Sequence, residues 1–388
     1  TSCDETAICL VEIDGKAGRM RILGDTVHSQ VDVHASYGGV FPALAKREHQ
    51  KNLVPVLRKT LSEAGVLEES ANGTFSPDIV SKIDAILERE PELLQAFKAF
   101  VPTIKKPDID LMSVTVGPGL EPALWVGINF ARALACAWGV PLVPCNHMEG
   151  HILAALIRQE NGGYSLLHDG ISYPALSLLI SGGHTQIVLV EKIGSYKIVG
   201  ETLDDAVGEC FDKTARTLGL EYPGGPKISK LAALARAEGV QSPEPLPRPM
   251  MESGDLDFSF SGLKTAVLYM TKRLREKGSL DERTIKGICR EIEDAVTDVV
   301  VGKMRQAIET YAAETLIIGG GVIANSNIRA ALETLADECS VRILLPQADH
   351  STDNGLMIAL AGYFNRDKAA SADTALKAVG TLPIGPRA

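Results

Sequence analysis

Apolar residues along this chain follow two patterns, which together predict layers of strands and helices. Short apolar runs of strand length precede longer stretches in which apolar residues recur every three or four positions, as on one face of a helix. Glycine-rich turns separate two of these pairs, at Gly117 and at Gly319. We expect strands at 110–116, 141–144, 315–318 and 341–345, and helices at 123–138, from about 325, and at 355–364.

An internal repeat suggests that the α/β pattern occurs twice. Ser2 to Thr6 and the apolar strand after it resemble Ser181 to Thr185 and its following strand, at an offset of about 179 residues. A turn and a second strand come next in both halves. Two such polar hairpin tips predict duplicated lobes of the actin-like ATPase kind, in which hairpins grip nucleotide phosphates. The alternative is a chance likeness between two amphipathic hairpins.

Composition narrows the class of protein further. With 388 residues, 45% of them hydrophobic, the chain is long enough for two cores. Its net charge of −10 argues against a general nucleic-acid binder, because phosphate contacts need lysine and arginine. A nucleic acid would therefore meet a local basic face or a partner. Seven dispersed cysteines suit a reducing compartment.

The segment His147-Met148-Glu149-Gly150-His151 is the sharpest chemical signal. It follows a predicted strand and Asn146, a good helix N-cap. Four-residue spacing places both imidazoles on one helix face, where they can ligate one metal ion. Glu149 lies about 200° round the helix from either histidine, so the zinc-protease arrangement is disfavoured. Solvated or capping histidines are the alternative.

Two imidazoles leave room for a carboxylate and for phosphate oxygens of a substrate. Asp353, between a predicted strand and the last helix, is the best candidate. Because an aspartate in this position is usually a helix cap, spacing alone leaves both roles open.

Two glycine-rich turns are candidate anion or nucleotide contacts. Ser181-Gly182-Gly183-His184 lets backbone amides approach a phosphate, and the matching first tip contributes Ser2, Asp4, Glu5 and Thr6. Gly319-Gly320-Gly321 joins a strand to a helix but lacks dinucleotide-fold spacing and a following phosphate-loop lysine, so we expect it on the adenine side. Ordinary tight turns would look the same.

Two further clusters have equally plain alternatives. Asp212, in an acidic segment before Tyr222-Pro223-Gly224-Gly225-Pro226, could contact ribose hydroxyls or could simply cap a helix. The basic residues Lys264, Lys272, Arg273 and Arg275 form the best candidate nucleic-acid face, or a solvated helix surface.

Taken together, these residues resemble one family, the TsaD tRNA threonylcarbamoyladenosine transferases, once described as glycoproteases. The resemblance runs the length of the chain. The segment 66–107 departs from it as a longer, acidic stretch with interspersed prolines, and we expect a helical insertion at the periphery there. The matching stretches are 1–6, 116–120, 146–151, 181–186, 211–215, 222–226, 258–264, 319–322 and 352–355.

The resemblance implies an actin-like fold (ribonuclease H-like) with two duplicated lobes and an interlobe cleft. We expect a first lobe over 1–140, completed by 355–388, and a second lobe over 141–354 with the metal and nucleotide site. The family implies His147, His151 and Asp353 as metal ligands. Its implied substrate contacts are Ile180, Ser181, Gly182, Gly183, His184, Asp212, Gly225 and Asn325.

The implied reaction transfers threonylcarbamoyl from threonylcarbamoyl-AMP to the adenosine at position 37 of tRNAs that read codons beginning with A. The implied cofactor is one divalent ion per subunit, with Fe²⁺ the first choice over Zn²⁺, Mn²⁺ or Mg²⁺. Expected partners are tRNA and either a paralogous actin-like protein with a small ATPase helper or a second copy of the chain. We expect a cytoplasmic location, or a mitochondrial one if a transit peptide preceded Thr1.

Two other classes remain open at this stage. One is a small-molecule kinase or O-carbamoyltransferase of the same superfold, which would leave tRNA unmodified. The other is a regulatory nucleotide-binding scaffold, which would bind an adenylate without turnover.

Overall fold

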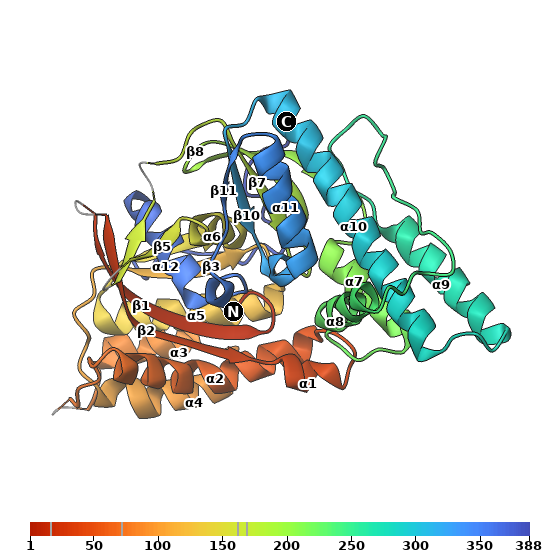
Figure 1. Ribbon diagram of the computed structural model, residues 1–388. Helices are drawn as coiled ribbons and strands as arrows, with labels where there is room; N and C mark the ends of the chain where they lie inside the picture. Colours follow the sequence, from red (N-terminus) through yellow and green to blue (C-terminus); the bar gives the residue numbers. More distant parts are fainter. Residues whose placement is uncertain (16–17, 71–72, 161–162, 168–169) are drawn as a thin grey trace. The chain divides into compact units, whose positions relative to one another are not determined.

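The structure is a computed structural model that describes residues 1–15, 18–70, 73–160, 163–167 and 170–388. The chain forms two compact units, each with strands and helices (Figure 1). The first contains Thr1–His34, Val40–His168 and Thr352–Ile384. The second contains Ala35–Gly39, Asp169–Ser351 and Gly385–Ala388.

The first unit contains a four-stranded antiparallel sheet and a separate parallel pair. In the sheet, β1 (Glu5–Asp14) pairs with β2 (Arg19–Ser29), and β6 (Gly163–Leu166) and β5 (Ile157–Glu160) continue it. The parallel pair is β3 (Met112–Gly117) with β4 (Leu142–Asn146). Helix α5 connects these two strands, as a parallel connection requires.

Helices pack around these strands and form the core of the first unit. The predicted insertion folds into helices whose apolar faces enter this core, where Ile83, Leu93 and Phe97 are fully buried. Phe97 meets Phe130 edge to face, with 6.0 Å between ring centroids. The prediction of a peripheral insertion is therefore wrong, because its helices supply part of this core. The helices of this unit, with α1 reaching the boundary, are α1 (Val31–Ala35), α2 (Pro42–Glu63), α3 (Pro77–Ile86), α4 (Pro91–Phe100), η1 (Val101–Thr103), α5 (Glu121–Trp138), α6 (His147–Ala154), α12 (Gly355–Phe364) and η4 (Arg366–Lys368).

The second unit is built on a five-stranded sheet with β7 (Ala175–Ile180) at its centre. Every residue of β7 is buried, including Ser177, its one polar residue, as suits a central strand. β7 pairs antiparallel with β8 (Thr185–Lys192) and parallel with β10 (Thr315–Gly319). The outer strands are β9 (Ser195–Glu201) and β11 (Arg342–Leu344).

Long helices cover this sheet. The longest, α10 (Glu282–Tyr311), buries Ile292, Val296 and Val300 along one face. The other helices of this unit are α7 (Val207–Leu218), α8 (Gly224–Ala237), α9 (Ser261–Glu276), η2 (Gly321–Ala324), α11 (Ser326–Glu338) and η3 (Ala348–His350).

The predicted fold class is confirmed, since both units are α/β and each contains one of the expected hairpins, β1–β2 and β8–β9. The compact units divide at about 168 and 352, whereas the sequence placed the lobe boundaries at 140 and 354. Residues 141–168 belong with the first unit because β4 pairs with β3 and α6 packs against α12. Among the described residues, no helix combines the length and apolar character needed to cross a bilayer.

Candidate metal and nucleotide site

Helix α6 presents the two histidines. The side-chain Oδ1 of Asn146 accepts hydrogen bonds from the backbone N–H groups of Met148, at 2.9 Å, and Glu149, at 3.3 Å. This cap starts the helix at His147, so His151 lies one turn on and on the same face. The ring centroids are 4.9 Å apart. The rings meet edge to face, with 88° between their planes, and the predicted placement of both on one helix face is confirmed.

Asp353 meets both histidines, as the sequence predicted. Its Oδ2 lies 3.1 Å from His147 Nε2, and its Oδ1 lies 3.2 Å from His151 Nε2. The alternative role as a helix cap falls to the next residue, because Asn354 Oδ1 accepts the backbone N–H of Met357 at 2.9 Å. Asp353 therefore contacts the two histidines and does not cap α12. One ligand atom from each of these three residues, which we call the metal group, lies within 4.8 Å of the others.

The surroundings of these three residues suit a metal ion. His151 is buried, which lowers its pKa against the opposing effect of Asp353, so its imidazole is neutral at pH 7. Burial acts to raise the pKa of Asp353, but His147 and His151 outweigh it and hold that pKa well below its usual range. His147 Nδ1 and His151 Nε2 are buried and lack a well-directed hydrogen bond from any described residue, although Asp353 lies close to the second. Two imidazoles and a carboxylate are a fitting donor set.

Glu149 has a different partner. It is buried, and its carboxylate accepts a hydrogen bond from Asn365 Nδ2 at 2.9 Å, just beyond α12. The group of three possible ligands does not include it. This contact agrees with the sequence-based argument against a protease arrangement.

The residues of the first hairpin tip, predicted to bind phosphate, contact other protein side chains in the structure. Ser2 Oγ donates to Asp353 Oδ2 at 2.7 Å. Thr6 turns into the core, where its hydroxyl contacts His49 Nδ1 at 2.7 Å. Burial, together with the charges of Asp353 and Asp4, raises the pKa of Glu5 to about 10. Phosphate binding by Ser2, Asp4, Glu5 and Thr6 stays a prediction, while the contacts of Ser2 assign it a role beside Asp353.

A cavity of about 1210 Å³ in the first unit borders this group. His147 and Asp353 form part of its wall, and the facing edges of β1 and β3 form much of the rest. The wall is mostly apolar, with Ile8 and Phe130 among its residues. Charged residues away from the histidines also line it, among them Glu12, Arg21 and Asp110.

In the second unit, the predicted nucleotide turns meet at one edge of the sheet. β7 and β10 are parallel neighbours, so their carboxyl ends lie together, which is where open α/β sheets bind ligands. The turn after Ile180 is closed by the Ser181 N–H, which donates to the His184 carbonyl at 2.9 Å. A side chain at Gly182 or Gly183 would meet nothing within 4 Å, so this backbone is open to a ligand.

Gly320 shows why the second turn needs glycine. Its φ is +95°, and a Cβ there would lie 2.3 Å from the Ile180 carbonyl oxygen. The turn Gly319–Gly321 therefore packs directly against the end of β7. This contact brings the two predicted nucleotide turns together.

Asn325 lies at the start of α11 and Gly225 at the start of α8, while Asp212 lies within α7. Asp212 Oδ1 accepts the backbone N–H of Gly224 at 2.7 Å and so caps the start of α8, with Gly225 next along the chain. Asn325 caps α11, because its Oδ1 accepts from the N–H groups of Asn327 and Ile328, both at 3.0 Å. Capping is thus present at both Asp212 and Asn325, and their contact with a ribose or base stays a prediction.

Known proteins resemble this chain along most of its length. The family model for TsaD, tRNA N6-adenosine threonylcarbamoyltransferase, matches residues 21–72 and 90–360. The chain belongs to the TsaD family. It is 40% identical to the tRNA N6-adenosine threonylcarbamoyltransferase of Polynucleobacter asymbioticus, over 93% of this chain and 89% of the relative. It is 39% identical to the protein of that name from Chromobacterium violaceum, over 93% and 90% of the two chains.

The TsaD match includes all three residues of the metal group and leaves out 73–89, where α3 lies in the insertion. Solved structures offer looser likenesses. Component A of (R)-2-hydroxyglutaryl-CoA dehydratase from Acidaminococcus fermentans is 14% identical, with a TM-score of 0.45 over 94% of this chain and 100% of that one. Full-length HypF is 11% identical, with a TM-score of 0.45 over 74% and 51%. Overlays this loose carry no argument about function.

The predicted tRNA face of this TsaD-family chain is largely engaged in contacts within its own unit. Lys264 pairs with Asp205 at 2.7 Å, and Arg273 pairs with Glu244 at 2.5 Å. Arg275 donates to the Thr217 carbonyl at 2.8 Å. Lys272 is exposed on α9. The two ion pairs neutralise part of the positive charge, so these residues alone form a modest basic surface.

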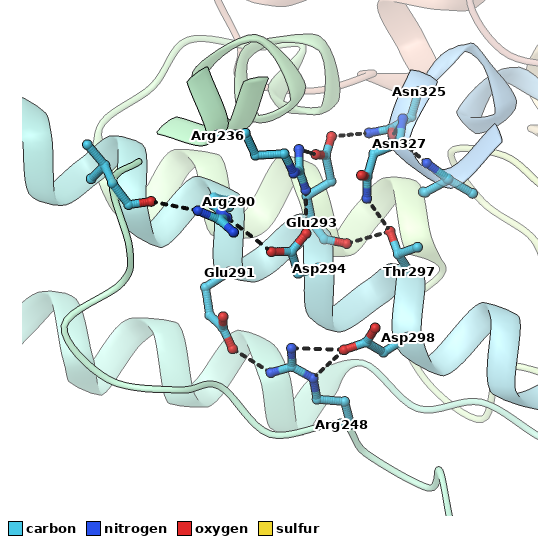
Figure 2. A network of polar contacts seen from close by, with 12 residues as sticks. Arg236, Arg248, Arg290, Glu291, Glu293, Asp294, Thr297, Asp298, Asn325 and Asn327 are labelled. Carbon is cyan, nitrogen blue, oxygen red and sulfur yellow. Dashed lines mark hydrogen bonds and ion pairs between the residues drawn. The ribbon is translucent and has the colours of Figure 1, made fainter. Parts of the chain in front are cut away.

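Sequence reasoning missed one polar group at the nucleotide edge of the TsaD-family chain. Glu293 is almost wholly buried on α10 and contacts Asn325 (Figure 2). Helical periodicity could have indicated that Glu293 is buried, because it lies on the same face as the buried residues Cys289, Val296 and Val300. A carboxylate among core positions requires a partner, and no spacing rule identifies which residue provides it.

Proposed function

We propose that this chain transfers a threonylcarbamoyl group from threonylcarbamoyl-AMP to N6 of the adenosine at position 37 of tRNAs that read codons beginning with A. The observation that carries the proposal is the convergence of His147, His151 and Asp353 in a TsaD-family chain. The Polynucleobacter and Chromobacterium relatives have names that state threonylcarbamoyl transfer to N6 of a tRNA adenosine, and they align over most of their length.

The reaction forms one bond and breaks another. The N6 amine attacks the carbamoyl carbon, the bond from that carbon to the phosphate oxygen breaks, and AMP leaves with the electron pair. The proton lost from N6 passes to a base, for which His184 and the carboxylate of the substrate are the candidates. Because AMP leaves as an anion, groups that stabilise negative charge on its phosphate lower the barrier.

The metal group fits this need. His147, His151 and Asp353 would hold a divalent ion, which when bound supplies positive charge to the adenylate phosphate. The donor set suits Fe²⁺, our first choice, and also Zn²⁺, Mn²⁺ or Mg²⁺. Ser2 orients the Asp353 carboxylate through its hydrogen bond. Glu149 is engaged by Asn365, which favours transfer to an amine over activation of water.

The turns at the carboxyl edge of β7 and β10 would bind the nucleotide part. The open amides of Gly182 and Gly183 suit a phosphate oxygen. The backbone of Gly319–Gly321 would accept the flat adenine, and Asp212, Gly225 and Asn325 would contact the ribose or base. Positioning the carbamoyl carbon for the amine would then supply much of the rate enhancement.

We further propose the partners and location that this reaction requires. The tRNA is the acceptor, and because Lys264 and Arg273 already pair with acids, a second protein would supply part of its binding surface. That protein would be a paralogous actin-like chain with a small ATPase, or a second copy. The bacterial cytoplasm, where tRNA is modified, would be the location.

A nucleoside digest tests the proposed function. Purified protein, with and without candidate partners, is incubated with tRNA and threonylcarbamoyl-AMP labelled in its threonine, and the tRNA is digested to nucleosides. We expect labelled N6-threonylcarbamoyladenosine from the wild type and a large loss in His147→Ala and Asp353→Ala. A small-molecule kinase or O-carbamoyltransferase would leave adenosine unlabelled, and a regulatory scaffold would bind the adenylate without turnover; either result would overturn the proposal.

A further inference from the structure

Asn325 is held by a polar network on α10 that includes a buried charge. Figure 2 shows Glu293 between Asn325 and Arg236. Glu293 Oε1 accepts from Asn325 Nδ2 at 2.6 Å, and its Oε2 accepts from Arg236 Nη1. The Glu293 side chain is only 1% exposed. All three residues belong to the second unit.

The network leaves the Asn325 carboxamide one orientation. An ionised carboxylate can only accept hydrogen bonds, so the amide nitrogen must face Glu293. The amide oxygen is then directed to the start of α11, where it accepts from the N–H groups of Asn327 and Ile328. Since Nδ2 carries two hydrogens and Glu293 uses one, the other remains available to a ligand.

Arg236 supplies the positive charge that pairs with the buried carboxylate of Glu293. A buried carboxylate without a partner is costly, and removing one partner of such a pair is strongly destabilising. The fork of Arg236 contacts Glu293 through Nη1 and Asp294 through Nη2, and Arg290 also contacts Asp294 at 3.4 Å. Arg236 is thereby fixed by two acids from consecutive positions of α10.

Asn325 lies where the proposed nucleotide edge needs a fixed donor. It directly follows η2, which begins in the Gly319–Gly321 turn, and Gly320 packs against Ile180 of β7. The contacts of its side chain run from this edge through Glu293 to Arg236 on α8. A change in Glu293 would therefore alter a donor at the nucleotide edge without altering the metal ligands.

We propose that Glu293, paired with Arg236, is a positioning residue that fixes the Asn325 carboxamide so that its second N–H binds the adenosine part of the adenylate. This inference rests on the proposed function, because it takes Asn325 as a contact of the nucleotide. Glu293 itself does not reach the ligand. Its effect passes through one hydrogen bond to Asn325.

A second ion-pair group on the same helix provides a matched control. Arg248 contacts Glu291 and Asp298, and neither acid touches Asn325 (Figure 2). Arg248 is about as buried as Arg236, with 23% and 29% of the side chains exposed. Glu291 is less buried than Glu293, with 19% against 1% of the side chain exposed, so Glu291→Gln controls for the loss of an ion-paired charge from α10.

The experiment compares Glu293→Gln with Glu291→Gln in three measurements: AMP binding by calorimetry, transfer kinetics with threonylcarbamoyl-AMP, and metal affinity. A glutamine at 293 can turn its own amide toward Asn325, so the carboxamide loses its single orientation. We expect Glu293→Gln to raise the Kd for AMP and the KM for the adenylate about tenfold with kcat within twofold of wild type. Metal affinity should not change, and Glu291→Gln should match the wild type throughout.

Asn325→Ser provides the second variant, since serine keeps the cap of α11 but removes the amide. We expect it to raise the same Kd about as far, and Glu293→Gln should add no further effect in its background. The proposal is overturned if Glu293→Gln binds AMP like the wild type, if Glu291→Gln is equally impaired, or if the two effects add fully. AMP binding without tRNA modification would reject the proposed function while leaving this inference standing.

Discussion

At the scale of single residues, Asp353 and Asn354 have different roles although they are neighbours in the chain. Asp353 and Asn354 are both good helix caps by sequence, and spacing cannot say which one caps α12. The structure assigns capping to Asn354, which leaves Asp353 for the histidines. The histidine pair was predictable because a spacing of four residues places two side chains on the same face of any α-helix. The contact from Ser2 was not, because it joins residues 351 positions apart.

Removal of the Ser2 hydroxyl should weaken metal binding. Ser2 donates to the Oδ2 of Asp353, and loss of such a supporting hydrogen bond typically costs 10- to 100-fold in metal affinity, so we expect a loss of about tenfold in Ser2→Ala. Competition with a chromogenic chelator measures it. Ser195→Ala removes an exposed hydroxyl that bonds Glu191, and it should bind metal like the wild type. Equal affinities for Ser2→Ala and wild type would contradict the role of Ser2.

His49 should make stability fall at mildly acidic pH. It is buried between Thr6 and the Cys3 carbonyl, and burial is the main cause that lowers its pKa to about 3. Because the folded-state pKa lies below the unfolded value of about 6.5, the unfolded chain binds the proton first. The contribution is complete above pH 6.5 and is lost as the pH falls toward 3.

Between pH 6.5 and 5 this site alone should cost about 2 kcal/mol of the free energy of unfolding. Urea unfolding of wild type and His49→Gln at both pH values measures the difference. Glutamine has an amide that can donate to the Cys3 carbonyl, so the variant should fold but lose this share of the pH dependence. The same pH dependence in both proteins would show that His49 does not remain neutral.

At the scale of elements, local sequence predicted the strands and helices well and their packing less well. The strand predicted at 315–318 is β10, and the cap at Asn146 predicted the start of α6. The insertion was harder, because an amphipathic helix shows which face is apolar but not what that face covers. Here that face joins α2 and α5, with Phe97 against Phe130.

The cap of α6 should contribute both to the free energy of unfolding and to metal affinity. Asn146→Ala removes the acceptor for two backbone N–H groups and should lower the free energy of unfolding by about 1 kcal/mol. It should also lower metal affinity, because the first turn carries His147. Asn146→Ser retains a capping oxygen and should recover most of both.

Asp281→Ala is the control for this prediction. Asp281 caps α10 through the N–H of Thr284 at 2.8 Å, so its loss should affect stability to a similar extent. Metal affinity should stay unchanged, because α10 belongs to the other unit. A fall in metal affinity of the same size in both alanine variants would show that the effect comes from global destabilisation and not from α6.

At the scale of the whole molecule, the repeat predicted two α/β units, but it could not give the boundary between them. After α5 the chain enters β4, and the sequence does not say whether β4 joins β3 or begins the next unit. Parallel pairing with β3 decides this, and it carries His147 and His151 into the same unit as Asp353. The metal group is thus complete within the first unit, although its third residue comes from near the end of the chain.

The central claim is that this metal group supports transfer to tRNA, and metal titration of chelator-treated protein tests it most directly. Transfer of labelled threonylcarbamoyl from the adenylate to tRNA, with the required partners present, is measured against Fe²⁺ bound per chain. The account predicts that activity rises in step with occupancy to one ion per wild-type chain, and that His147→Ala neither binds the ion nor regains activity. Full transfer by wild-type protein with no ion bound would contradict it.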